Sequence, residues 1–107
     1  MRRKPLQLST ILKALDHNLI EDVALYDVRE KTALFDTVLI ATVRSYPQME
    51  ACVRYLEDVT DLRGIEMGRD WTLIDLGDVI IHLFAPNDRE HYGLDQILAP
   101  YIMKKQD

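Results

Sequence analysis

The chain has 107 residues, of which 48% are hydrophobic and 29% charged, and its formal net charge at pH 7 is −5. This length holds one hydrophobic core and excludes two, and the composition excludes a disordered, collagen-like or membrane protein. Because Cys52 is the single cysteine, an internal disulfide is excluded and a reducing compartment is favoured.

The start of the chain predicts neither export nor membrane insertion. The basic residues Arg2, Arg3 and Lys4 are followed too soon by Lys13 and Asp16 for the apolar stretch of a signal peptide. No run approaches the roughly 20 apolar residues that cross a bilayer. We therefore expect a cytoplasmic protein with no membrane association.

Charge is unevenly distributed along the chain. Residues 2–4 and 104–105 are all basic, and the segment between them keeps 8 of the 13 basic residues but 17 of the 18 acidic ones. An acidic surface repels phosphate backbones, so we expect no direct sequence-specific binding of nucleic acid and favour a basic protein as partner. Acidity that only maintains solubility is the alternative.

The first expected element is a helix, because apolar residues recur every three or four positions from Leu8 to Leu19. It should end near His17 and Asn18. Residues 23–28 and 37–43 form two short apolar segments, the second rich in β-branched residues, which is typical of buried strands. A charged link joins them.

A second helix is predicted from residue 45 to Gly64. Ser45 and Gln48 have the spacing of a capping box, in which each side chain bonds a free backbone N–H, and Pro47 is tolerated in the first turn. Cys52 falls on the apolar stripe of this helix. We therefore interpret Cys52 as a core residue, since a reactive thiol needs exposure and a nearby base.

Residues 71–76 and 79–84 are predicted to pair as a tight hairpin, because Gly77 and Asp78 suit a two-residue type II′ turn. The turn fixes the register. One surface then carries the pairs Ile74–Ile81 and Thr72–Leu83, and the other carries Asp75–Ile80, Leu73–His82 and Trp71–Phe84. The second surface mixes aromatic, polar and aliphatic side chains, which indicates a contact surface.

A last helix is expected to begin with Asn87 as N-cap and Glu90 at the third position, and Pro100 should interrupt it. Its inner stripe would hold Leu94, Ile97, Leu98 and Tyr101. The predicted order is α-β-β-α-β-β-α, with a further short strand near Glu66 left open. We expect residues 1–107 to form a single α/β domain with short basic ends, in which helices flank a mixed sheet.

Motifs for catalysis are missing. The sequence has no G-x-x-x-x-G-K-[ST], G-x-G-x-x-G or C-x-x-C, so we expect no cofactor. Asp75, Asp78 and His82 are the best metal candidates, but Asp78 lies in the turn and the other two are only diagonal neighbours across the hairpin. The alternative for His82 is a hydrogen-bonded core or interface residue, with Asp75 as one candidate partner.

Aromatic residues gather at the open end of the predicted hairpin. The register places Trp71 beside Phe84, and the last helix begins nearby with Arg89 and Tyr92. Buried aromatic residues and arginine are typical of interface hot spots. The alternatives are that Trp71 is a core residue and that Arg89 pairs with a local acid.

These same residues carry a family resemblance. Residues 71–84 read WTLIDLGDVIIHLF and residues 89–95 read REHYGLD. They resemble the W-x-L-x-D-x-G-D-V-x-V-H-x-F and R-x-x-Y-x-L-E motifs of the ribosomal silencing factor family, also called Iojap-related. Residues 36–42 resemble the family strand D-Y-F-V-I-x-T, and Ser45 stands at the serine of T-G-x-S. The match runs from about residue 8 to residue 98, nearly the whole chain.

The chain departs from the family pattern at five positions. Thr37 and Val38 replace a Tyr-Phe pair, Val43 replaces a glycine, Asp95 replaces a glutamate and Leu98 replaces a tryptophan.

The resemblance implies a nucleotidyltransferase-like fold without catalytic residues, and hence a protein that is not an enzyme. It further implies binding to the large ribosomal subunit through ribosomal protein fourteen, which blocks joining of the small subunit and represses translation when nutrients are limiting. The implied partner surface, or its direct support, consists of Trp71, Asp75, His82, Phe84, Arg89 and Tyr92, followed by Asp36 and Ser45.

Two other functions stay open at this point, a nucleotide- or metal-dependent transferase and an assembly adaptor of the large subunit. We expect a monomer or a weak homodimer.

Overall fold

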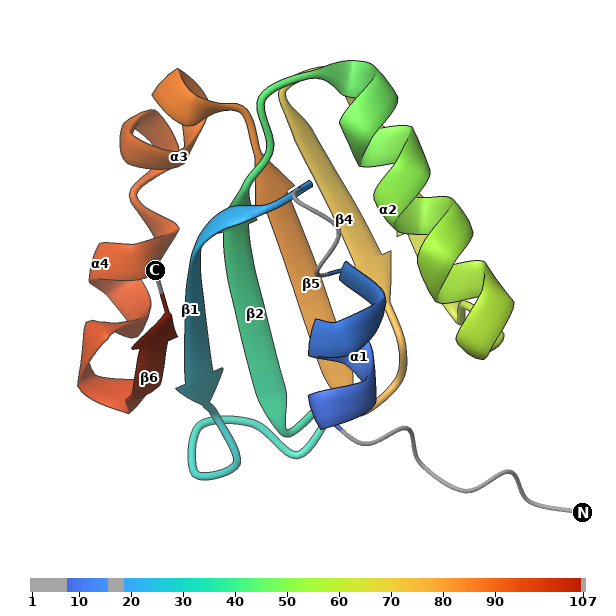
Figure 1. Ribbon diagram of the computed structural model, residues 1–107. Helices are drawn as coiled ribbons and strands as arrows, with labels where there is room; N and C mark the ends of the chain where they lie inside the picture. The colour runs from blue at the N-terminus through green and yellow to red at the C-terminus, as the bar shows by residue number, and fades with distance from the viewer. Residues whose placement is uncertain (1–7, 16–18, 107) are drawn as a thin grey trace, which may run out of the picture.

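A six-stranded mixed sheet with strand order β3-β4-β5-β2-β1-β6 forms the centre of the computed structural model, which describes residues 8–15 and 19–106 (Figure 1). The central pair β2 and β5 is parallel, and the other neighbours are antiparallel. The strands are β1 (Glu21–Asp27), β2 (Thr37–Thr42), β3 (Gly64–Glu66), β4 (Trp71–Asp75), β5 (Val79–Phe84) and β6 (Ile102–Gln106).

Helices lie on both faces of this sheet. The two that pack into the larger core are α1 (Leu8–Leu15) and α2 (Tyr46–Val59). On the other face lie α3 (Pro86–Tyr92), α4 (Leu94–Leu98) and the 3₁₀ helix η1 (Ala99–Tyr101). The predicted α/β class and mixed sheet are confirmed, whereas the nucleotidyltransferase-like relationship stays a prediction.

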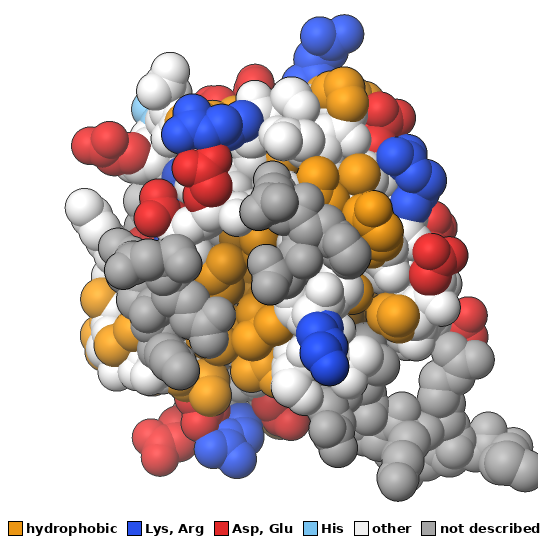
Figure 2. All heavy atoms as spheres, in the orientation of Figure 1, with side chains coloured by type: hydrophobic (Ala, Val, Ile, Leu, Met, Phe, Trp, Pro, Cys, Tyr) orange, Lys and Arg blue, Asp and Glu red, His pale blue; other side chains and the backbone are white. Residues whose placement is uncertain are grey.

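The larger core forms where α1 and α2 meet the sheet. Leu39 and Ile81 of the two central strands and Leu56 of α2 are 0% exposed. Each such side chain contributes roughly 1.5–3 kcal/mol by leaving water. Figure 2, in the orientation of Figure 1, shows hydrophobic side chains gathered near the middle of this view and most of the charged ones towards its rim.

Cys52 lies in the same core. It is 0% exposed, and burial raises the pKa of its thiol to about 12. This burial confirms the interpretation of Cys52 as a core residue. A thiol that stays protonated at neutral pH is also a poor nucleophile.

The β4–β5 hairpin has the predicted register, with Trp71 opposite Phe84 and Ile74 opposite Ile81. Gly77 adopts a φ of 96°, in the left-handed region that glycine occupies without penalty. The Leu76 N–H donates to the Val79 carbonyl at 2.9 Å. The two-residue connection therefore fixes which side chains share a face.

The start of α2 is as predicted, because the Ser45 hydroxyl accepts from the Gln48 backbone N–H at 3.3 Å. The second bond of the predicted capping box, from the Ser45 backbone N–H to the Gln48 side chain, does not form, since Gln48 Oε1 is buried without a hydrogen-bond partner. The predicted end was also wrong. The extended backbone of Thr60, with φ −160°, ends the helix after Val59. Gly64 instead begins β3, so the short strand near Glu66 that the sequence analysis had left undecided is present.

The last helix differs most from its prediction. It begins at Pro86 rather than after Asn87, and no side chain caps it. Gly93, with φ 65°, then ends α3 and starts α4, so one predicted helix becomes two. Ile97, expected on the inner stripe, is 62% exposed, although Leu98 is buried.

The two ends of the described chain also differ from expectation. Strand β6, which pairs with β1, was not predicted. Strand β1 begins two residues earlier than expected, at an irregularity where Asp22 has a φ of 51°. The predicted end of the first helix, at His17 and Asn18, lies outside the described residues, and α1 is described as far as Leu15.

Candidate functional site

One half of the sheet face that carries α3 and α4 remains partly open. Along β4 the residues pointing to the larger core, Thr72 and Ile74, are 0% exposed. Trp71, Leu73 and Asp75, which alternate with them and point to the other face, are only half-buried. The β4–β5 part of this face is therefore available for contact, as the mixed surface of the hairpin predicted.

Four aromatic rings gather on this face, and we call them the aromatic cluster: Trp71, His82, Phe84 and Tyr92. The ring of Trp71 lies 4.9 Å from Phe84, 4.8 Å from Tyr92 and 5.8 Å from His82, centroid to centroid. Phe84 is 0% exposed and Tyr92 is 50% exposed. The cluster thus has a buried base and an accessible edge, the arrangement found at interface anchors.

Trp71 and His82 are also hydrogen-bonded. The indole Nε1–H donates to His82 Nδ1 at 3.1 Å, across the diagonal of the hairpin. Burial lowers the pKa of His82 to about 4, so the imidazole is neutral near pH 7. The structure confirms the interpretation of His82 as a hydrogen-bonded residue, with Trp71 as its partner rather than Asp75.

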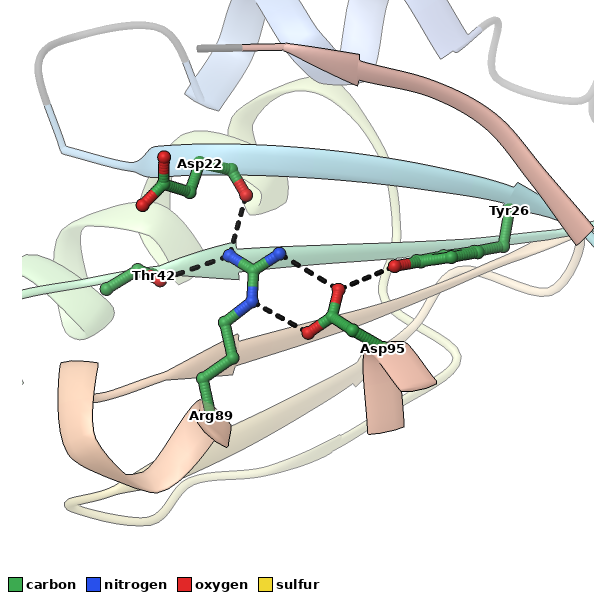
Figure 3. Close-up of polar contacts among 5 residues, drawn as sticks. All are labelled: Asp22, Tyr26, Thr42, Arg89 and Asp95. Atoms are coloured by element: carbon green, nitrogen blue, oxygen red, sulfur yellow. Dashed lines mark hydrogen bonds and ion pairs between the residues drawn. The ribbon is translucent and has the colours of Figure 1, made fainter. Parts of the chain in front are cut away.

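Arg89 belongs to α3, the helix that carries Tyr92, and its hydrogen bonds join this helix to the sheet (Figure 3). Its guanidinium makes a bidentate ion pair with Asp95, in which Nε donates to Oδ2 at 2.8 Å and Nη2 donates to Oδ1 at 3.0 Å. The Arg89 side chain is 12% exposed. Its third nitrogen donates to the Asp22 carbonyl at 2.6 Å and to the Thr42 hydroxyl at 3.1 Å. Arg89 therefore supports the site by pairing with a local acid, one of the two alternatives that the sequence left open.

Tyr26 completes this network from β1. Its hydroxyl donates to Asp95 Oδ1 at 2.6 Å, and burial together with the nearby carboxylate raises the pKa of the phenol. A pocket of about 400 Å³ opens beside these residues and is lined also by Glu90 and Gln96. The network fixes α3 and α4 against β1 and β2, and thereby sets where Tyr92 lies.

The remaining predicted site residues lie apart from the cluster. Asp75 shares its face, but Asp75 Oδ1 accepts from the Gly77 N–H at 2.8 Å and so stabilises the turn. Asp36 bonds Val28 and Asp78 through its backbone just before the opposite end of β2, about 20 Å from the Phe84 end. Ser45 caps α2, a helix of the other face.

Sequence reasoning missed the partners of Arg89. A signal was present for one of them, because Asp95 follows Arg89 within two helical turns. A signal was also present for Tyr26, the second partner of Asp95, because it interrupts an apolar strand with a hydroxyl that needs a partner when buried. Asp22 and Thr42 gave no signal, because they meet Arg89 only through the sheet.

Within residues 8–15 and 19–106, no three His, Cys, Asp or Glu side chains are placed to hold a metal ion. The hairpin group of Asp75, Asp78 and His82 is therefore not a metal site in this structure. No helix in that part of the chain is long and apolar enough to cross a membrane.

The comparisons with known proteins agree with the motifs. The family model described as "Ribosomal silencing factor during starvation" matches residues 2–106. The ribosomal silencing factor RsfS of Bacillus subtilis is 33% identical over 91 residues, covering 78% of this chain and 77% of that protein. The chloroplastic protein Iojap of Arabidopsis thaliana is 38% identical over 63 residues, covering 53% of this chain and 26% of that protein.

A crystal structure of a protein from Chromobacterium violaceum matches the fold with a TM-score of 0.74 at 27% identity, covering 85% of this chain and 82% of that one. The family model extends over nearly the whole sequence, so the resemblance read from the motifs is confirmed. This chain belongs to the ribosomal silencing factor family, to which its hairpin and last helices had already pointed.

Proposed function

We propose that this protein binds the large ribosomal subunit through ribosomal protein fourteen and so blocks joining of the small subunit, repressing translation when nutrients are limiting. Membership of the ribosomal silencing factor family supports a regulatory role. The observation that carries the docking proposal is the aromatic cluster, because its accessible edge, Tyr92, is 50% exposed beside a half-buried Trp71.

The charge around the cluster favours a basic partner. Asp75 lies on the same sheet face, and Glu66 of β3, opposite Leu73, lies at its edge. Ribosomal proteins are mostly basic, so such carboxylates would assist their approach and suppress binding of acidic proteins. The net charge of −5 acts in the same direction at longer range.

In this proposal the protein acts by steric exclusion in the cytoplasm, without catalysis or a cofactor. The nucleotidyltransferase-like relationship would then concern the scaffold alone. The pairing network of Arg89 fits this role, since it places a rigid helix start against the sheet and leaves the cluster preorganised for a partner.

Co-sedimentation with isolated large subunits, small subunits and joined ribosomes tests the proposal. We expect the protein to pellet with large subunits alone. Tyr92→Ala removes the accessible edge and should weaken binding at least 10-fold. Ile97→Ala is the matched control, because Ile97 is also exposed, at 62%, but belongs to α4 outside the cluster.

A joining assay completes the test. Excess wild-type protein should lower the fraction of subunits that associate, and Tyr92→Ala should not. Binding to small subunits, or normal joining in the presence of saturating protein, would contradict the proposal.

A further inference from the structure

The two ring nitrogens of His82 have different surroundings. Nδ1 accepts the hydrogen bond from the Trp71 indole at 3.1 Å. An indole N–H can only donate, so Nδ1 must offer a lone pair. In a neutral imidazole the proton then resides on Nε2. The contact with Trp71 therefore selects one of the two tautomers of His82.

The other nitrogen, Nε2, has no hydrogen-bond partner among the described residues and belongs to a side chain that is only partly buried. In the part of the chain that the structure describes, the bond from Trp71 is the one hydrogen bond that the His82 side chain makes. Gln48 Oε1 is the buried side-chain nitrogen or oxygen atom left without a partner there. Nε2 is thus unpaired without being fully buried, and it offers its N–H on the open half of the sheet face.

We propose that the His82 Nε2–H is a specificity-determining donor of the docking face, that a main-chain carbonyl oxygen of the bound protein accepts from it, and that Trp71 is the positioning residue that holds the tautomer. This inference rests on the proposed function and names the chemistry of the contact. A carbonyl is the acceptor that fits, because Asp75 and Glu66 lie on the same face and repel a carboxylate.

The arrangement also explains why Trp71 is not itself the donor. Its indole N–H is already used within the chain, so Trp71 offers the partner only a ring surface. Tyr92 carries a hydroxyl that rotates freely, whereas the imidazole N–H points in one direction. A fixed donor surrounded by aromatic rings rejects a partner that lacks an acceptor there, because the N–H would be buried unpaired.

The first test uses the free protein. ¹⁵N NMR of the imidazole distinguishes the two tautomers from the shifts of Nδ1 and Nε2. We expect the Nε2–H form in the wild type and a mixture in Trp71→Phe, which keeps a ring but removes the donor. An Nδ1–H form in the wild type, or an unchanged tautomer in Trp71→Phe, would overturn the inference.

The second test measures binding to isolated large subunits. His82→Phe keeps a ring without a donor and should bind about 10-fold or more weakly, since an acceptor is left unpaired. His82→Gln places an amide N–H near the position of Nε2 and should recover most of the affinity, while His82→Asn, whose amide reaches only the position of Nδ1, should not. Each variant is first checked for an unchanged circular dichroism spectrum and melting temperature.

The two proposals fail in different ways. If the wild type does not bind large subunits, the proposed function fails, and the docking role of His82 fails with it. If the wild type binds and His82→Phe binds equally well, the proposed function stands and only the donor role is refuted.

Discussion

Replacing Asp95 by alanine should destabilise the protein strongly, although Asp95 lies on a short surface helix. Its carboxylate receives two hydrogen bonds from Arg89 and one from the Tyr26 hydroxyl. Asp95→Ala removes all three at once. It leaves the guanidinium of Arg89, which is 12% exposed, without its counter-charge.

The magnitude follows from the burial of the pair. Breaking a fully buried ion pair by removing one partner costs about 3–5 kcal/mol. Asp95 is 30% exposed, so water replaces part of what is lost, and we expect about 2–3 kcal/mol. For a domain of this size that corresponds to a fall in Tm on the order of 10 °C. Asp95→Asn keeps the shape and one acceptor, and should cost about half as much.

Urea unfolding followed by fluorescence measures this effect, because Trp71 is the single tryptophan and lies in the neighbouring cluster. A double-mutant cycle with Arg89→Met identifies the cause. The double variant should be about 1 kcal/mol or more less destabilised than the two single effects predict, since it leaves no unpaired buried charge. A loss below about 0.5 kcal/mol in Asp95→Ala, or strict additivity in the cycle, would refute the reasoning.

Three further predictions concern other parts of the molecule. Cys52 should resist an aromatic disulfide reagent at pH 8 in the native protein and react fully in denaturant, because burial raises its pKa to about 12; rapid native labelling would contradict this. Stability should be full above pH 6.5 and fall towards about pH 4, because unfolded chains protonate His82 at its ordinary pKa of 6.5 and the folded protein only near 4. The loss is on the order of 3 kcal/mol. Urea unfolding at a series of pH values should show this fall between pH 6.5 and 4 in the wild type beyond any fall in His82→Gln, and parallel pH profiles of the two proteins would contradict the reasoning. Gly68→Ala should lower the melting temperature by several degrees, since a Cβ would lie 2.5 Å from the Trp71 carbonyl oxygen, whereas Gly64→Ala, which meets only ordinary contact at 3.8 Å, is its control.

The hairpin was predictable because its information is local. Gly77 and Asp78 leave one compact way to connect two strands, and period-two alternation then assigns every side chain to a face. The neighbourhood of Trp71, Phe84 and Tyr92 followed from that register and from the short link to α3. The aromatic half of the candidate site could therefore be predicted from sequence alone.

The other half depends on contacts between distant segments. Arg89 reaches Thr42 and Asp22, which are 47 and 67 positions away, and no sequence pattern links them. Strand β6 could not be predicted from the sequence for a related reason. Ile102 and Met103 are both about half exposed, so the segment lacks the alternation of buried and exposed residues that is typical of a strand. The break at Gly93 was missed because an isolated glycine in an apolar helical pattern is usually tolerated.

The single parallel pairing in the sheet divides it into two antiparallel halves, β6-β1-β2 and β3-β4-β5. The two halves are joined only by the pairing of β2 with β5, which we call the seam. That seam joins residues about 40 positions apart, so its closure is slow compared with formation of the hairpin. Arg89 is bonded on the far side of the seam, to Thr42 and Asp22, while the helix that carries it follows β5 directly. During synthesis the hairpin that contains Trp71 could thus form early. The aromatic cluster would be complete only once residues 86–95 had been made and Arg89 had bonded to Thr42 and Asp22. The proposed docking face would therefore form in two stages, first the β4–β5 hairpin and then the segment that carries Tyr92.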